Sequence, residues 1–486
     1  MQFSFPRDGK ALAAAAHVLV LAPKACFGPR ARGAAALTRH LPRDAAALAQ
    51  RLGHDTAPGL LGALATTLAQ KQRLTVGVLP DDVSRHNSPA RAESIRKLVA
   101  GAGLAPDGKN AVLVVLDDDA HAAAAANAIG RALPTFTKKS QAKRGGSLAI
   151  ALALRSGKAV AVDAATQHLV ATARLAAELV DTPPTELDPQ ALAAAAKKAL
   201  RTVRGVRIQE LVGDALLQKG RGGIHAVGRC ARSAPRLLVA TCGPRRGRHI
   251  ALVGKGVTYD TGGLHLKARG AMETMKGDMG GAAAVLGAFL VLARSRPAHR
   301  LSLVLCMAEN AIGPAAYKPD DVLTMHSGMT VEINNTDAEG RLLLADGCSW
   351  AARVLGADTI LDAATLTGAQ GIATGDVHAA VVSSDEHVEQ ALLAAGRATG
   401  DLCWPLPFAP EFYRSEFASP IADMRNSVKN RSNAQSSCAA IFVHWHLDGT
   451  KVRWGHVDLA FPAFRGDRGT GFGVALLADA VRRLAK

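Results

Sequence analysis

The chain has 486 residues, of which 48% are apolar and 20% are charged, and this composition excludes an intrinsically disordered protein. Its length exceeds that of an ordinary single domain, so we expect two domains that each bury a core. The formal charge is +17, and apolar stretches such as residues 11–22 and 148–154 are too short for the roughly 20 residues of a membrane-spanning helix, so no membrane span is expected.

The first third of the chain alternates short apolar runs with a helical stretch. We expect strands at residues 18–21, 74–79 and 111–116 and a helix at residues 120–133, which is typical of a small α/β domain. Basic residues and glycines predict a loop at residues 135–146, and a helix at residues 164–180 should end before two prolines. The predicted domains are residues 1–150, a linker-helix region at 151–180, and a larger domain at 181–486.

Basic residues dominate residues 201–248, where Glu210 and Asp214 are the only acidic side chains. A surface that binds nucleic acid is one interpretation of this stretch. A solvated basic face explains it better, because no aromatic residues alternate with the arginines to stack on bases.

The second domain repeats the alternation on a larger scale. We expect strands at residues 237–240, 250–253, 301–306, 359–362 and 456–459, with helices at residues 280–294 and 341–355. Strands that are almost wholly apolar are buried on both faces. The predicted fold class is therefore α/β, with a smaller N-terminal α/β domain and a larger C-terminal α/β catalytic domain whose central, mostly buried sheet is flanked by helices.

The cysteines indicate a reducing compartment. There are seven of them, an odd number, widely scattered and without a CxxC pair, which suits free thiols in a cytoplasm. Arg7 and Lys10 before the apolar residues 11–22 resemble the start of a signal peptide. His17 interrupts that segment, and a first buried strand explains it equally well, so we expect a cytoplasmic protein.

Charged residues precede the apolar run of VEINNTDAEGRLLLADG, residues 331–347. Thr336 and Glu339 have the spacing of a capping box at a helix start, which leaves Asp337 and Arg341 unexplained. If residues 334–339 are extended, Asp337 and Glu339 project from the same surface.

A second stretch, VGKGVTYDTGGLHLKARGAMETMKGDMGGAAAV at residues 253–285, follows a predicted buried strand, where α/β domains usually place their sites. It holds Lys255, Asp260, Lys267 and Asp278 among many glycines. The chain has no HExxH, no GxSxG and no P-loop spacing, which argues against a simple zinc protease, a serine hydrolase and a phosphate-binding loop.

Four carboxylates that converge would raise one another's pKa unless cations neutralise them. Carboxylates that bridge two metal ions about 3.5 to 4 Å apart commonly serve to activate a water molecule. From spacing alone, a two-metal hydrolase and a structural network of ion pairs both remain open.

NTDAEGRLLLAD and VGKGVTYDTGGLHLK…MKGDMGGAAAV resemble, nearly residue for residue, signature segments of the leucine (cytosol) aminopeptidase family. LVDTPPTELDP, ATLTGA and DMRNS are similar to further landmarks of that family, in the same order, and the resemblance covers residues 164–486. It implies a metal-dependent aminopeptidase that removes the N-terminal residue of peptides, preferably leucine or another bulky apolar residue. It also implies a homohexamer built from two trimers.

The resemblance implies two divalent ions, zinc or else manganese, magnesium or cobalt. Lys267 would face the substrate carbonyl, and Arg341 would hold a bicarbonate ion that acts as general base. A lysine ligand must be neutral, so the pKa of Lys255 is expected to be lowered by the cations and by burial. The implied metal ligands are Lys255, Asp260, Asp278, Asp337 and Glu339, and the implied pocket for the first residue includes Met275, Thr365 and Gly368.

This sequence departs from the usual family pattern at three positions, Tyr259, Thr261 and His265. These variants resemble a less typical branch of the family. We expect His265 to tune the activity rather than to abolish it.

Overall fold

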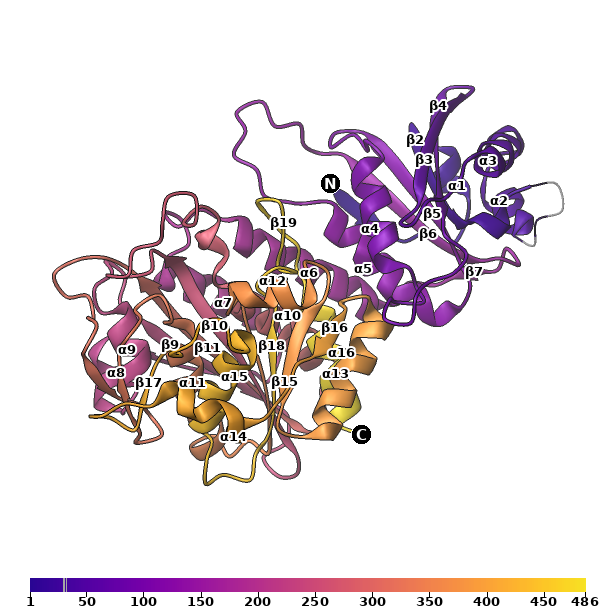
Figure 1. Ribbon diagram of the computed structural model, residues 1–486. Helices are drawn as coiled ribbons and strands as arrows, with labels where there is room; N and C mark the ends of the chain where they lie inside the picture. Colours follow the sequence, from indigo (N-terminus) through magenta and orange to yellow (C-terminus); the bar gives the residue numbers. More distant parts are fainter. Residues whose placement is uncertain (29–30, 32) are drawn as a thin grey trace. The chain divides into compact units, whose positions relative to one another are not determined.

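The computed structural model describes residues 1–28, 31 and 33–486, which form two compact units (Figure 1). The first unit comprises Met1–Ala171 and Gly396–Gly400, and the second comprises Thr172–Ala395 and Asp401–Lys486. Boundaries between the two units fall inside two helices, α6 (Ala164–Asp181) and α13 (Glu386–Thr399).

The first unit has a mostly parallel sheet in the order β1-β6-β5-β2-β4-β3, with β7 paired to β6. Side chains of β2 alternate between two separate core clusters, Val18 and Val20 in one and Leu19 and Leu21 in the other, so the sheet is buried on both faces. The strands and the helix predicted in this region are confirmed. The elements are β1 (Gln2–Ser4), α1 (Lys10–Ala13), β2 (His17–Pro23), α2 (Ala34–His40), α3 (Arg43–Asp55), β3 (Ala63–Ala69), β4 (Gln72–Leu79), α4 (Ala92–Gly101), β5 (Lys109–Leu116), α5 (Ala122–Ala132), β6 (Ser147–Leu154) and β7 (Ala159–Val160).

The second unit is built on a sheet in the order β16-β15-β18-β14-β10-β11-β9-β8. Its central strands β18, β14, β10 and β11 are parallel, and the antiparallel pairs lie toward the two edges. The strands are β8 (Arg207–Val212), β9 (Arg236–Cys242), β10 (His249–Asp260), β11 (Arg300–Asn310), β14 (Thr359–Ala364), β15 (Ala379–Ser383), β16 (Cys403–Pro405) and β18 (Arg453–Asp458). Shorter strands form two small sheets, with β12 (Val322–Thr324), β13 (Thr330–Glu332) and β17 (Met424–Arg425) in one and β19 (Phe464–Arg465) and β20 (Arg468–Gly469) in the other.

Two helices of this unit pack directly on the central strands. α10 (Gly280–Arg294) packs against β10, β11, β14 and α16 (Val474–Leu484), whereas α11 (Gly340–Arg353) packs against β10, β11, β14 and α15 (Gln435–Trp445). The predicted α/β sheet with flanking helices is therefore confirmed. The remaining helices are α7 (Pro189–Leu200), α8 (Asp214–Gln218), α9 (Gly222–Gly228), α12 (Gly368–Thr374) and α14 (Pro410–Tyr413).

The strand predicted at residues 250–253 is much longer in the structure. β10 continues to Asp260, because residues 254–257 and Asp260 pair with β11, with a shift in register between Val257 and Asp260. Lys255 therefore lies inside a strand, and Asp260 is at the end of it. Glycines at 254 and 256 weaken the strand signal in the sequence, and the pairing with β11 compensates for them.

One helical stretch, Met275–Arg294, has the length and the mean hydropathy, 1.4, of a membrane span. Because 89% of it is buried inside the protein, we interpret it as a core helix rather than as a span.

Candidate functional site

The candidate site lies at the carboxyl ends of the parallel strands of the second unit. Asp260 ends β10 and is paired with Asn310, which ends β11. A cavity of about 900 Å³ is present there, at the usual location for ligand sites in α/β sheets. Its lining includes every catalytic, metal-binding and pocket residue implied by the family resemblance, namely Lys255, Asp260, Lys267, Met275, Asp278, Asp337, Glu339, Arg341, Thr365 and Gly368.

Lys255 is buried in β10, with 3% of its surface exposed. Its Nζ donates to Asp278 Oδ1 at 2.7 Å and to the Thr365 carbonyl oxygen at 2.9 Å, and it lies 3.0 Å from Glu339 Oε1. Burial lowers the pKa of Lys255, but the surrounding carboxylates outweigh burial and hold that pKa above its ordinary value. The protein's own groups thus act against the lowered pKa expected of a lysine ligand, and Lys255 would bind a divalent cation only as the neutral amine, after loss of its Nζ proton.

Lys267 joins the two halves of the site. Its Nζ lies 2.7 Å from Asp260 Oδ2 and 2.6 Å from Asp337 Oδ1. Burial lowers the pKa of Lys267, and the Asp260 carboxylate more than offsets this effect, so that pKa is raised and the side chain stays charged. A fixed ammonium group in this position can stabilise negative charge on a bound carbonyl oxygen.

The segment before α11 is a turn rather than the extended chain considered from the sequence. The Asp337 amide donates to Asn335 Oδ1 at 2.9 Å, and the Ala338 amide donates to the Asn335 carbonyl at 3.2 Å. The predicted capping box is wrong as well. Thr336 Oγ1 donates to the Gly262 carbonyl, and Glu339, at the N-cap position of α11, makes no side-chain capping bond. Thr336 and Glu339 instead make contacts with Gly262 and Lys255, and these tertiary contacts outweigh local capping.

Glu339 is 2% exposed and lies at the start of α11 beside Lys255. The next residue, Gly340, leaves room for the lysine, because a Cβ atom there would lie 2.5 Å from Lys255 Cε and would push that side chain aside. Burial, followed by the neighbouring Asp260 carboxylate, raises the pKa of Glu339 to about 8. Burial also raises the pKa of Asp278 to about 6.

Arg341 is buried in the first turn of α11. Its Nη1 donates to the Asn426 carbonyl at 2.9 Å, whereas its buried Nε has no hydrogen-bond partner among the described residues. Burial lowers the pKa of Arg341 to about 10. A buried guanidinium N–H group without a partner is unfavourable and suits a small anion.

The donor set fits divalent cations. Asp260, Asp337 and Glu339 each offer an oxygen atom, and these three atoms lie within 4.8 Å of one another. Asp278 Oδ2 is buried and has no hydrogen-bond partner in the part of the chain that the structure describes. Buried carboxylates whose pKa is raised are unfavourable as anions, and hard oxygen ligands of this kind bind divalent metal ions.

Three supporting residues were missed from the sequence. Asn310 donates to Asp260 Oδ1 at 2.8 Å and to the Thr336 carbonyl at 3.1 Å, and Tyr317 also donates to that carbonyl, at 2.5 Å. Asn426 Oδ1 accepts from the amide of Asn335 at 3.1 Å. Of the three, only Asn426 could have been found from the sequence, because it belongs to the DMRNS segment that resembles the family. Asn310 and Tyr317 are placed by contacts between strands and loops that are distant in the chain.

His265 contacts the backbone of the Asp337 turn. Its amide donates to Thr336 Oγ1 at 2.8 Å, and its Nδ1 accepts from the Thr336 amide at 3.1 Å. The side chain therefore supports the turn through Thr336, and its effect on activity stays a prediction.

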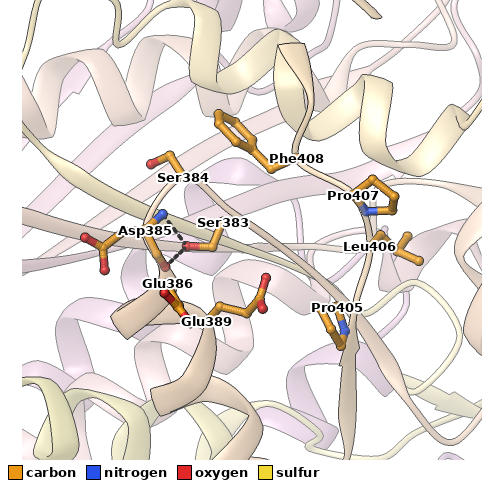
Figure 2. Close-up of a pocket in the computed structure, with 9 residues that line it drawn as sticks. All are labelled: Ser383, Ser384, Asp385, Glu386, Glu389, Pro405, Leu406, Pro407 and Phe408. Atoms are coloured by element: carbon orange, nitrogen blue, oxygen red, sulfur yellow. Dashed lines mark hydrogen bonds between the residues drawn. The ribbon is translucent and has the colours of Figure 1, made fainter. Parts of the chain in front are cut away.

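A second hollow has a volume of about 470 Å³. One side is formed by the end of β15 and the start of α13, and the other side is formed by the end of β16 and the segment that follows it. Figure 2 shows acidic side chains on one side of it and Pro405, Leu406, Pro407 and Phe408 on the other. Asp385 Oδ1 accepts from the Val388 amide at 2.9 Å, which is a helix-capping contact. Among the residues that the structure describes, no lysine or arginine lines this hollow, in contrast to the cavity around Lys255.

Comparison with known protein families identifies both parts of the chain. Residues 174–478 match the model of the cytosol aminopeptidase family, catalytic domain, and residues 35–142 match the M17 aminopeptidase N-terminal domain 2.

Individual proteins resemble the chain over most of its length. The probable aminopeptidase NPEPL1 of Homo sapiens is 45% identical over 413 residues, which are 83% of this chain and 78% of the human protein. The apo structure of leucyl aminopeptidase from Trypanosoma cruzi matches with a TM-score of 0.89 and 38% identity. The match covers 99% of this chain and 96% of the Trypanosoma cruzi chain. The bottromycin maturation enzyme BotP, solved in complex with Mn, has a TM-score of 0.79 and 28% identity, covering 97% of this chain and 100% of its own.

Proposed function

The chain belongs to the cytosol aminopeptidase family, the M17 metallo-exopeptidases, and we propose that its aminopeptidase reaction takes place in the cavity around Lys255 and Glu339. The observation that carries this placement is the convergence of three carboxylates within 4.8 Å, beside the buried Lys255 and the half-buried Lys267, at the carboxyl ends of the central strands. The family also supports the predicted domain division, since its two models cover residues 35–142 and 174–478.

Two divalent ions are proposed to bind here, and when bound they would act as Lewis acids and lower the pKa of a water molecule. The proposed ligands are Lys255, Asp260, Asp278, Asp337 and Glu339, with Asp260 and Glu339 shared between the ions. Zinc, manganese, magnesium and cobalt are the candidates. Manganese has the support of a relative, because BotP was solved in complex with Mn.

Lys267 would act on the substrate carbonyl, and Arg341 would act on the proton of the attacking water through a bound bicarbonate ion. The Lys267 ammonium, held between Asp260 and Asp337, would donate to the scissile carbonyl oxygen as negative charge develops there. The free Nε of Arg341 would hold a bicarbonate ion, which would take the proton from the attacking water.

The first residue of the peptide would occupy the part of the cavity lined by Met275, Thr365 and Gly368. Ala460, Phe461 and Phe464 line the same cavity, so a bulky apolar residue such as leucine would bury most of its surface. Methionine adapts its shape, which favours a range of apolar first residues.

We propose a cytoplasmic location, which the seven free cysteines support. A homohexamer built from two trimers remains a proposal from the family resemblance. The family models and the relatives support the aminopeptidase and give no support to nucleic-acid binding by residues 201–248.

The proposal is tested by measuring hydrolysis of leucine p-nitroanilide before and after chelation, followed by readdition of Zn²⁺ or Mn²⁺. Activity should disappear with the chelator and return with a divalent ion, in parallel with metal content. Activity that resists complete metal removal, or no activity with any of the metals, would reject the proposal.

A further inference from the structure

Two segments of chain contribute walls to the proposed first-residue pocket. One wall is the loop after β14 with α12, which contributes residues 365–369 and Ile372 to the lining. The other wall follows β18 and contributes Ala460, Phe461 and Phe464. The distance between these walls decides which side chains fit between them.

One buried carboxylate is bonded to both walls. Asp458 ends β18 and is 1% exposed. Its Oδ1 accepts the Leu366 amide at 3.1 Å and the Ala460 amide at 3.3 Å, and its Oδ2 accepts the Thr367 hydroxyl at 2.6 Å. Hydrogen bonds to an ionised acceptor are shorter and stronger than neutral ones, so this connection is rigid.

Neighbouring contacts support the same connection. Gln370, which is fully buried, accepts the Phe461 amide on its Oε1 at 2.9 Å. A Cβ atom on Gly371 would lie 2.4 Å from the Phe461 ring, so helix α12 and the second wall are already in close contact. The Thr367 hydroxyl also lies 2.7 Å from Ser436 Oγ of α15, which fixes its direction.

We propose that Asp458 is a positioning residue that sets the width of the first-residue pocket and thereby selects among first residues by size. This inference rests on the proposed function, because it requires the first residue to bind between these walls. Among the described residues, the Asp458 carboxylate bonds none of the proposed metal ligands, and it acts through Leu366, Thr367 and Ala460. One methylene group more or less in a hydrophobic pocket changes kcat/KM by about 10- to 200-fold, so a shift of either wall should change the preference among first residues.

A matched control separates this role from general stabilisation. Asp401 is also fully buried, and its carboxylate accepts the amides of Gly473 at 3.0 Å and Leu476 at 3.4 Å, at the start of α16. It bonds backbone amides as Asp458 does, but Asp401, Gly473 and Leu476 are not among the residues that line the cavity. Loss of either carboxylate leaves buried amides without a partner, so both changes should destabilise the fold.

The experiment compares Asp458→Ala, Asp458→Asn and Asp401→Ala by kcat and KM on leucine and alanine p-nitroanilides, with thermal midpoints and metal content measured alongside. We expect Asp458→Ala to lower the leucine-to-alanine ratio of kcat/KM by about tenfold at unchanged metal content. Asp458→Asn should recover part of the ratio, because its side-chain oxygen still accepts the two amides. Asp401→Ala should lower the thermal midpoint and leave the ratio within about twofold of wild type.

An unchanged ratio in Asp458→Ala, or an equal shift in Asp401→Ala, would overturn the inference. If Asp458→Ala does not fold, Thr367→Val and Thr367→Ser replace it. Valine removes the 2.6 Å hydroxyl contact and should lower the ratio, whereas serine keeps the contact and should retain the ratio. A wild-type protein that hydrolyses neither substrate would reject the proposed function itself, and an active wild type with insensitive variants would reject only the role of Asp458.

Discussion

The cavity around Lys255 and the hollow beside Ser383 both contain several carboxylates, but among the described residues three of them converge in the cavity and none do so in the hollow. In the cavity, Asp260, Asp278 and Glu339 are buried and face Lys255 and Lys267. In the hollow, the acidic side chains are exposed or half-buried (Figure 2). Among the described residues of the hollow, no three acidic groups converge within metal-binding distance.

For binding a cation, loss of hydration and the convergence of the carboxylates therefore matter more than the number of acidic side chains. Water stabilises the exposed carboxylates of the hollow, so they gain little from a cation. The buried carboxylates of the cavity have lost that hydration, and a divalent ion would restore the favourable interaction.

The largest effect is expected for Glu339→Gln, which removes a charge shared by both proposed metal positions. Replacement of a supporting group around a metal typically costs 10- to 100-fold, so loss of this direct ligand should cost more than about 100-fold in kcat/KM. Kinetics on leucine p-nitroanilide and elemental analysis of metal content measure it. Full activity with normal metal content would contradict the assignment of Glu339.

Lys267→Ala should lower kcat by about 100- to 1,000-fold, the range found for loss of one group that stabilises an oxyanion. Metal content should stay near that of the wild type, because Lys267 is not a proposed ligand. Lys267→Arg, which keeps the charge, serves as the control and should retain more activity. Equal loss of metal and of rate in Lys267→Ala would indicate instead that Lys267 holds the carboxylates together.

Arg341→Ala should lower kcat by up to about 100-fold, a typical contribution of general-base catalysis, and keep most of the metal. Added bicarbonate should raise the rate of the wild type more than that of the variant. If Arg341→Ala fails to fold, then the structural network of ion pairs considered from the sequence is the better interpretation of this side chain.

The raised pKa of Glu339, about 8, predicts a pH dependence of stability in the chelator-treated protein. Between about pH 4.5 and 8 the folded state keeps a proton on Glu339 that the unfolded state has lost, so the free energy of unfolding should fall as the pH rises. Urea unfolding at pH 5 and pH 8 measures this decrease. Glu339→Gln should reduce the decrease, and metal addition should reverse it.

The smallest effect is expected in the hollow. Glu389→Gln should change kcat/KM by less than about twofold, because the side chain lies outside the cavity, and should change stability by about 0.5 kcal/mol or less. Burial raises the pKa of Glu389. Glu339 is buried and Glu389 is half-buried, so Glu389→Gln should leave most of the pH dependence of stability in place. A large loss of activity would show that the two regions are functionally linked.

Regular elements were predictable where one physical signal dominated. The helix at residues 280–294 matches α10 because an apolar run of that length forms a buried helix. β10 was predicted too short, because Gly254 and Gly256 carry no strand signal of their own and its end is defined by pairing with β11. The helix start at Gly340 was displaced from the predicted cap at Thr336, because Thr336 bonds Gly262 instead.

The sequence by itself determined the α/β class, the family resemblance and the types of side chain that the chemistry requires, since these depend on local composition and on spacing along the chain. Only the tertiary structure decided that Lys255, Asp278 and Glu339 meet within hydrogen-bonding distance, that Asn310 supports Asp260, and that Asp458 joins two walls of the cavity. The physical reason is that these contacts join residues far apart in the chain. Strand register and desolvation place them, and neither quantity is encoded in a short stretch of sequence.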